Sequence, residues 1–533
     1  MAKYRISKAI GIDLGTTNSV VAILNPTDTD IIVHRDDKTK AETTPSCIWK
    51  NSKTGEIAVG RKAFARLGNM PEPIKSIKRS MGQQKTVCVT DEDMSPEKIS
   101  SLILKEMKRQ IEEDVAHFST DSIEYIVDRA IVTVPAYFDQ PQIEATRKAA
   151  EMAGLQVLEL LHEPTAAACY HCWETNTQNG IFLVYDLGGG TFDVSIVRCT
   201  EGEFEVLGVS GNNRLGGDDL DVLLAEDLVT RLVQQDYDLT FDYKDQKDNL
   251  RFTKLKQIAE GAKIALSTVN EYVLRDQATL QDKSGERVLI DIPCERYEFD
   301  QIIESVVERT IPYCFDALEK ASKKAGITLE NIDQIILAGG STHIPIVREI
   351  VQKTFCANSS VHGPRAKCVE PIYKKVDTVV ALGAAIRAAA TGGLVVYDQN
   401  NTVSVSFRGI SATEARYAYV GGVVEALNPT LNLSDGTIKL TVPNMNYEDE
   451  QDIKANGAFS FTHIPLQPSV DNLLVFEIYD EYGVSITTVE RSLHQSEQNL
   501  RPTGGSTGTA TLSKHIKMDV VGANEKRERI TLF

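Results

Sequence analysis

Two segments of the chain, at residues 9–24 and 182–197, repeat one pattern: an apolar strand, an Asp, a turn rich in Gly and Thr, and a second apolar strand. The Asp before the turn is Asp13 in the first segment and Asp186 in the second. Each pattern predicts a β-hairpin with a carboxylate and small residues at its tip. Two copies in one chain indicate a duplicated α/β fold that holds a ligand between its halves.

The residues of these tips suit a phosphate group held through a cation. Glycine lets backbone N–H groups approach phosphate oxygens, and threonine adds hydroxyl donors. An Asp beside phosphate needs a cation between the two negative groups, so the pattern predicts Mg²⁺ held through coordinated water. A single D-x-G turn is common, and one hairpin alone would leave an ordinary turn equally open.

A third turn follows the buried strand predicted over residues 334–338, where Gly339 and Gly340 precede a helical segment. A strand–Gly–Gly–helix junction lets a flat base or a ribose lie close to the backbone. Any α/β turn can use two glycines, so this junction alone is weak evidence for a nucleotide site. It becomes stronger evidence because it follows the two hairpins in the chain. Together the three turns predict a nucleotide site.

The charge of the chain argues against a nucleic-acid partner. Asp and Glu number 75 against 57 Lys and Arg, which gives a net charge of -18. An acidic chain repels phosphate backbones, so a nucleotide site must supply its own positive groups. The 533 residues predict several domains. The chain shows no signal-peptide pattern and no apolar run of membrane-spanning length, so we expect a cytoplasmic protein without a membrane partner.

The nine cysteines are scattered and odd in number, which is typical of free thiols in a reducing cytoplasm. Cys169 and Cys172 form a lone C-x-x-C inside a run that predicts a helix. With no second pair nearby, buried core cysteines are the better interpretation, ahead of a metal or redox site.

Seven motifs then give the chain a family resemblance. They are GIDLGTTNS at 11–19, IKR at 77–79, VTVPAYF at 132–138, HEPTAAA at 162–168, DLGGGTFDVS at 186–195, LGGDDLD at 215–221 and GGSTHIP at 339–345. In this order they resemble the DnaK-type heat-shock chaperones of the actin and sugar-kinase superfamily. The resemblance implies an actin-like ATPase domain over residues 1–392, with two lobes around a nucleotide cleft. It implies ATP or ADP with Mg²⁺, and K⁺ as a further candidate cation.

The resemblance also implies roles for individual residues. The catalytic set would be Asp13, Lys78, Glu163, Asp186 and Thr191, with Lys78 touching the transferred phosphate and Glu163 at the hydrolytic site. Such a set suits phosphoryl transfer, which needs positioning and charge neutralisation and no nucleophilic side chain. The Mg²⁺ shell would be held by Asp13, Asp186 and Asp193. The nucleotide would be contacted by Gly15, Thr16, Thr17, Gly188, Gly189, Gly190, Gly216, Gly217, Glu260, Lys263, Ser267, Gly339, Gly340, Ser341, His343 and Asp377.

Spacing adds independent support at Glu260, Lys263 and Ser267, which the resemblance places against adenosine. Their offsets of three, four and seven residues put all three on one face of a helix. Without the resemblance, a solvated polar face would be the preferred interpretation. Pro135 has two equal interpretations: the family's relay between nucleotide and peptide sites, or a simple strand terminator.

The last third of the chain begins with a helical run at 377–390 whose many small residues predict close helix packing. Residues 393–399 then place an exposed apolar run between a flexible glycine pair and an Asp. This segment resembles the family's interdomain linker, and an ordinary strand is the alternative.

Beyond this segment the apolar residues alternate, which predicts an antiparallel β domain over 400–497. It loosely resembles the family's peptide-binding β-sandwich, so we expect an extended apolar stretch of an unfolded polypeptide as partner. The predicted strands of this domain cover 402–408, 437–442, 458–464, 473–479 and 485–491.

Residues 498–533 predict a Gly/Ser/Thr spacer and a short tail. They leave no room for the family's helical lid, so we expect faster peptide release.

Three positions depart from the family pattern. Ile143 and Glu159 replace arginines of the interdomain relay and of the contact with J-domain cochaperones, so coupling and J-domain binding are in question. His343 replaces an arginine that stacks on adenine, and its charge depends on pH.

These features favour an ATP-driven, peptide-binding chaperone served by J-domain and nucleotide-exchange partners. The alternative is a nucleotide-regulated interaction module whose β domain serves one dedicated protein. A small-molecule kinase is less favoured, because it would need a sugar or acid pocket with an acceptor base. An actin-like filament is less favoured still, because actins carry no linker and β-sandwich after the ATPase domain.

Overall fold

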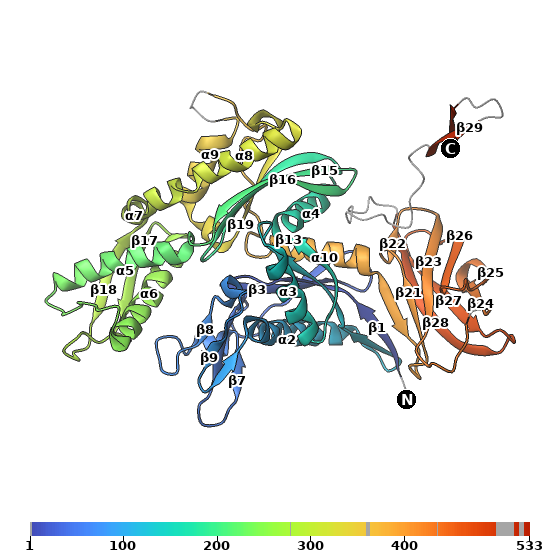
Figure 1. The fold of residues 1–533 in the computed structure, drawn as a ribbon, viewed down its shortest axis with the longest axis horizontal. Helices are drawn as coiled ribbons and strands as arrows, with labels where there is room; N and C mark the ends of the chain where they lie inside the picture. The colour runs from blue at the N-terminus through green and yellow to red at the C-terminus, as the bar shows by residue number, and fades with distance from the viewer. Residues whose placement is uncertain are drawn as a thin grey trace.

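The structure is a computed structural model that describes residues 3–277, 279–358, 363–433 and 435–496, together with the backbone of β29 (Ile516–Val521) and β30 (Arg527–Leu532). It is a mixed α/β fold with several sheets (Figure 1). Within this described part, no helix is both long enough and apolar enough to cross a lipid bilayer.

The first predicted hairpin forms the centre of one sheet. Strand β2 (Ile10–Asp13) pairs in antiparallel fashion with β3 (Asn18–Leu24) and in parallel with β12 (Arg129–Val134). Strands β13 (Gln156–His162) and β4 (Ile31–Val33) complete the path. Asp13 is the last residue of β2, so its carboxylate stands at the end of the sheet.

The second predicted hairpin has the same surroundings in another sheet. Strand β14 (Gly180–Leu187) is antiparallel to β15 (Phe192–Thr200) and parallel to β19 (Gln334–Ala338), and β16 (Glu203–Asn212) lies beyond β15. Both hairpins therefore pair in parallel, through their first strand, with a strand from later in the chain. This common plan confirms the duplication predicted from the repeat.

Helices α10 (Val379–Gly392) and α4 (Glu163–Thr175) pack together, and α10 also lies against β2 (Figure 1). A Cβ atom at Gly383 would lie 1.7 Å from the Ala166 carbonyl oxygen, and one at Gly11 would lie 2.1 Å from the Ala385 nitrogen. These approaches confirm the predicted close packing, because any larger residue would push the backbones apart.

The predicted helix that carries Cys169 and Cys172 is α4, and both thiols are buried in hydrophobic clusters. This burial confirms the core interpretation of the C-x-x-C pair.

The remaining long helices surround the two sheets. Helix α2 begins after Ser95, whose hydroxyl accepts a hydrogen bond from the Lys98 N–H, and α3 begins with a capping box between Asp139 and Gln142. These helices are α2 (Pro96–Val115), α3 (Gln140–Met152), α5 (Gly217–Val233), α6 (Gln246–Leu266), α7 (Arg296–Glu308), α8 (Ile311–Ala325) and α9 (Pro345–Phe355).

All five strands predicted within residues 400–497 are confirmed. Two sheets share one hydrophobic cluster that includes Phe407, Phe459, Phe461 and Phe476. The strands are β21 (Val403–Phe407), β24 (Thr437–Val442), β26 (Ala458–Pro465), β27 (Asp471–Tyr479) and β28 (Ser485–Gln495), joined by β22 (Ala412–Thr413), β23 (Tyr417–Ala426) and β25 (Tyr447–Asp452).

The apolar run that resembled an interdomain linker is a buried strand, β20 (Leu394–Tyr397). It pairs on one side with β1 (Tyr4–Lys8) and on the other with β21, within the six-stranded order β11-β1-β20-β21-β23-β26. The expectation of an exposed segment is therefore wrong, and the strand alternative is confirmed. The physical reason is that β1 supplies a hydrogen-bonding edge, while Leu394 and Val396 pack into the core of the β domain.

The sheet that contains β20 extends to the N-terminal region through β1 and β11 (Ile123–Ile126). Of the predicted tail, the structure describes the antiparallel backbones of β29 and β30, and the predicted spacer at 498–515 lies outside the described residues.

Candidate functional site

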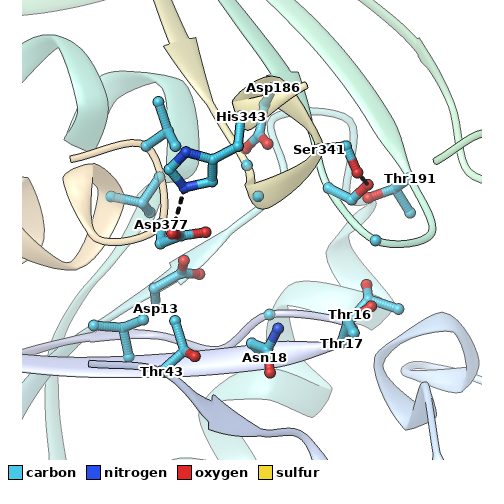
Figure 2. A pocket seen from close by; sticks show the side chains of 18 of the residues that line it. Asp13, Thr16, Thr17, Asn18, Thr43, Asp186, Thr191, Ser341, His343 and Asp377 are labelled. Atoms are coloured by element: carbon cyan, nitrogen blue, oxygen red, sulfur yellow. Dashed lines mark hydrogen bonds and ion pairs between the residues drawn. The ribbon is translucent and has the colours of Figure 1, made fainter. Parts of the chain in front are cut away.

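The three predicted turns meet around a cavity of about 670 Å³. Figure 2 shows Asp13 and Thr16 on one wall and Asp186, Ser341 and His343 on the facing wall. Most of the residues predicted from the sequence line it. They are Asp13, Gly15, Thr16, Thr17, Lys78, Glu163, Asp186, Gly188, Gly189, Thr191, Glu260, Lys263, Ser267, Gly339, Gly340, Ser341, His343 and Asp377.

Four predicted residues lie beside the cavity. Asp193 faces Asp186 across the β14–β15 hairpin and lines a small space behind the site together with Glu163. Gly190 and Gly216 touch, since a Cβ atom at Gly216 would lie 2.6 Å from the Gly190 nitrogen. The fourth is Gly217, whose N–H donates to the Gly188 carbonyl oxygen at 3.0 Å. Gly216 and Gly217 therefore pack directly against the turn after β14, which contains Gly188 and Gly190.

Three aspartates give the floor of the site a concentration of negative charge. Burial raises the pKa of Asp13 to about 7 and that of Asp186 to about 8, and the nearby Glu163 carboxylate adds to both shifts. Burial and Glu163 also raise the pKa of Asp193 well above its usual range. Such shifts show that the carboxylates lack enough positive charge nearby.

The donor set fits Mg²⁺, which prefers oxygen ligands. The buried Asp193 Oδ1 has no hydrogen-bond partner among the described residues, so it is available to a metal-bound water. Nowhere in the described chain do three His, Cys, Asp or Glu side chains converge closely enough to ligate one ion directly. Asp13, Asp186 and Asp193 are the residues that would hold the ion.

A buried cation at this floor, Lys78, is paired with a carboxylate. Lys78 Nζ donates to Glu163 Oε1 at 2.5 Å, and both side chains are buried. Burial alone would lower the pKa of Lys78, but the charges of Glu163, Asp13 and Asp193 outweigh it and raise that pKa. Lys78 therefore presents a positive charge beside the two hairpin tips.

The two hairpin tips touch each other. A Cβ atom at Gly189 would lie 2.4 Å from Thr17 Oγ1, so only glycine lets the turns approach this closely. Thr17 Oγ1 is buried and has no hydrogen-bond partner within the described residues. This hydroxyl is free to donate to a phosphate oxygen at the junction of the two tips.

The Gly339–Gly340 turn contacts the turn after β14. Gly339 has a φ of +83°, and a Cβ atom there would lie 2.4 Å from the Leu187 carbonyl oxygen. Ser341 Oγ donates to the Gly188 carbonyl oxygen at 2.9 Å. The strand–Gly–Gly junction is therefore fixed against the turn after β14.

The polar helical face predicted on α6 lines the same cavity. Lys263 Nζ forms an ion pair with Asp221 Oδ1 at 2.7 Å and donates to the Gly217 carbonyl oxygen at 3.3 Å. Glu260 and Ser267 line the cavity on the same helical face. The structure thus brings these residues to the Gly–Gly turn, and their contact with adenosine stays a prediction.

His343 and Asp377 close the outer end of the cavity. His343 Nε2 and Asp377 Oδ2 lie 2.7 Å apart, as the dashed line in Figure 2 shows. The hydrogen bond to Asp377 raises the pKa of His343. The structure adds Arg348, which the sequence reasoning missed, at the same end of the cavity. Its place early in α9, just after the Gly–Gly turn, was the available signal.

The two other departures lie outside the cavity. Ile143 is half-buried on α3. Glu159 Oε2 accepts a hydrogen bond from Arg387 Nε at 3.0 Å, so its charge is compensated from α10.

Comparison with known proteins places the chain in a family. The family model described as Hsp70 protein matches residues 9–89 and 83–509. The protein named Chaperone protein DnaK from Mycoplasmopsis agalactiae (strain NCTC 10123 / CIP 59.7 / PG2) is 39% identical over 386 residues, which cover 72% of this chain and 59% of that protein. The protein of the same name from Mycoplasmopsis pulmonis (strain UAB CTIP) is 37% identical over 422 residues, 79% of this chain and 63% of that protein.

The chain thus spans about three fifths of the length of these curated relatives. The family match covers both the cavity and the β domain. On this combination of motifs, geometry and similarity, the chain belongs to the Hsp70 family.

Proposed function

We propose that this chain binds ATP with Mg²⁺ in the cavity between the three turns and hydrolyses it there. The observation that carries the proposal is the buried Lys78–Glu163 pair, which stands among Asp13, Asp186 and Asp193 beside the two hairpin tips. Phosphoryl transfer needs this combination of fixed positive charge, hydroxyl and N–H donors, and a carboxylate near the attacking water.

Each of these residues has a separate task. Lys78 stabilises the charge that develops on the transferred phosphate, and the Thr17 and Thr191 hydroxyls orient its oxygens. Glu163 accepts a hydrogen bond from the attacking water and so aligns it, while its pair with Lys78 fixes both side chains. When bound, Mg²⁺ supplies charge neutralisation for the phosphates. The Gly339–Gly340 turn and the α6 face hold the adenosine.

The proposal extends to a molecular chaperone. Residues 1–392 form a two-lobed, actin-like ATPase domain, and residues 400–497 form a β-sandwich that binds extended apolar polypeptide. Support comes from the duplicated sheets, from the shared core of the two β-domain sheets and from relatives named as DnaK chaperones. J-domain and nucleotide-exchange cochaperones belong to the same proposal. Of these two partners, the J-domain cochaperone has the weaker support, because Glu159 stands where bacterial relatives have an arginine.

One observation favours the second candidate, a β domain that serves a dedicated partner. Strand β20 joins the β domain to the N-terminal strand β1 in one sheet, and the Ser411 N–H donates to Asp28 Oδ2 at 2.6 Å. A β domain held this firmly has less freedom to respond to nucleotide.

Steady-state ATP hydrolysis with and without an excess of an extended apolar peptide separates the two. A chaperone hydrolyses ATP faster when the peptide is present, and Lys78→Ala abolishes both rates. A hydrolysis rate that does not change when the peptide is added contradicts coupling between ATP hydrolysis and peptide binding, and it favours the dedicated partner. No hydrolysis above the Lys78→Ala level contradicts the proposed activity itself.

A further inference from the structure

A second cavity, of about 680 Å³, lies behind the wall of the nucleotide cavity. Thr16, Lys78 and Thr191 line both cavities. These are the residues proposed to surround the transferred phosphate. The two cavities therefore meet at the place where hydrolysis would release inorganic phosphate.

The second cavity is rich in positive side chains, although the whole chain has a net charge of -18. Its lining includes Arg79, Lys85, Arg214 and Lys256, while Asp218 and Asp219 are the opposing carboxylates. The four cations outnumber these two acids.

One of the opposing carboxylates is bound by the backbone, and the other lies near a cation of the same cavity. Asp219 Oδ2 accepts a hydrogen bond from the Gly216 N–H at 2.8 Å. Asp218 Oδ1 lies 3.9 Å from Lys256 Nζ, a separation too long for a tight pair. Arg214 is exposed to solvent at the rim of the cavity. An anion in this cavity would therefore meet positive charge that is only partly neutralised.

Arg79 connects this charge to the phosphate-binding turn. Its Nη2 donates to the Gly190 carbonyl oxygen at 2.5 Å. The guanidinium thus touches the turn after β14 on the side that faces the second cavity. Lys78, Arg79, Arg214 and Lys256 thus all line this one cavity.

We propose that the second cavity is the exit site for inorganic phosphate, where Arg214 and Lys256 hold the anion as it leaves. The inference rests on the proposed hydrolysis of ATP. Bound ADP would fill the nucleotide cavity and block a return through it, whereas only the wall that includes Thr16, Lys78 and Thr191 separates the released phosphate from the basic cavity. In an acidic molecule, a local positive site lowers the electrostatic barrier to the outward movement of a doubly charged anion.

The first test measures phosphate binding and requires no hydrolysis. The chain is saturated with Mg²⁺ and the non-hydrolysable β,γ-imido analogue of ATP, which occupies the position of the transferred phosphate. Binding of added inorganic phosphate is then followed by phosphorus NMR line broadening. We expect Arg214→Ala with Lys256→Ala to weaken binding by about fivefold or more, since two positive charges are lost.

Two controls accompany this test. Lys247→Ala removes an exposed lysine from the same helix α6, away from the cavity, and keeps the affinity of the unaltered chain. Arg214→Lys with Lys256→Arg keeps both charges and retains binding. A double alanine variant that binds phosphate as well as the unaltered chain overturns the exit site, whether or not the chain hydrolyses ATP.

The second test separates bond cleavage from release in a single turnover. Acid quenching measures cleavage, and a fluorescent phosphate sensor measures release. The double alanine variant should cleave ATP at the unaltered rate and release phosphate about threefold more slowly. Equal release rates overturn the exit site while the proposed function stands. A lack of cleavage in the unaltered chain contradicts the proposed function, and phosphate binding then decides the exit site.

Discussion

Lys8 and Asp28 form a buried ion pair with 2.5 Å between Lys8 Nζ and Asp28 Oδ1. Asp28 also accepts the hydrogen bond from the Ser411 N–H, and Lys8 donates to the Asn25 carbonyl oxygen at 2.7 Å. One carboxylate thus links the N-terminal strand, the turn after β3 and the β domain. The β domain is held by charge as well as by the strand pairing of β1 with β20.

Removal of the lysine tests this connection. Lys8→Met leaves the Asp28 carboxylate buried without its cation, and we expect it to lower the free energy of unfolding by about 3–5 kcal/mol. Lys8→Met combined with Asp28→Asn should cost less than Lys8→Met alone, because the Asp28 carboxylate is then not left buried without Lys8 and an acceptor for the Ser411 N–H is kept. Urea unfolding measures both, with Lys53→Met on an exposed turn as the control. Equal stability of Lys8→Met and the unaltered chain contradicts the structural role of the pair.

Gly339 provides a test of the nucleotide turn. Gly339→Ala forces a side chain into a left-handed conformation and against the Leu187 carbonyl oxygen. Gly326 has a φ of +69° with open space around it, so Gly326→Ala carries the backbone strain alone. We expect about 1 kcal/mol of destabilisation at Gly326 and about 2–4 kcal/mol at Gly339. Chemical unfolding measures the difference, and equal losses would show that the Leu187 contact costs nothing.

His343 predicts a pH dependence of nucleotide binding. Its hydrogen bond to Asp377 raises the pKa of His343, so the folded protein keeps the imidazolium to higher pH than an unfolded chain would. The stabilisation is complete below the ordinary histidine pKa and is lost as pH rises through the raised value. Arg348 and Asp377 are the charged groups that face His343.

Affinity for a fluorescent ATP analogue should therefore fall severalfold, by about 1 kcal/mol, as the imidazolium loses its proton over adenine. His343→Arg carries a permanent charge and should remove the part of this dependence that comes from the imidazole, while the part that comes from Asp13 and Asp186 stays. Asp377→Asn should move the fall to lower pH. A pH profile that is the same for His343→Arg and the unaltered chain contradicts a role for His343 at the base.

Local patterns predicted most of the elements that build the site. The hairpins and the Gly–Gly junction were recognisable because each places its Asp or Gly next to an apolar strand. The face with Glu260, Lys263 and Ser267 followed from helical spacing, and the structure places it at the cavity. Strand β23 escaped prediction because Gly421 and Gly422 interrupt its apolar alternation.

Features that depend on distant partners could not be predicted. The run at 394–397 is equally apolar as an exposed linker or as a buried strand, and only the position of β1 decides between them. The pairing of Glu159 with Arg387 joins residues far apart in the chain, as does the contact between Asp28 and Ser411. The basic second cavity likewise draws its cations from separate elements.

The most direct test of the proposed activity is single-turnover cleavage of radiolabelled ATP on the Mg²⁺-loaded chain. We expect the unaltered chain to cleave bound ATP and Lys78→Ala to slow cleavage by about 100-fold or more, because the fixed charge beside the transferred phosphate is lost. Lys75→Ala, an exposed change three residues earlier, should cleave at the unaltered rate. Intact ATP in the unaltered chain, or equal cleavage by Lys78→Ala, would contradict the account.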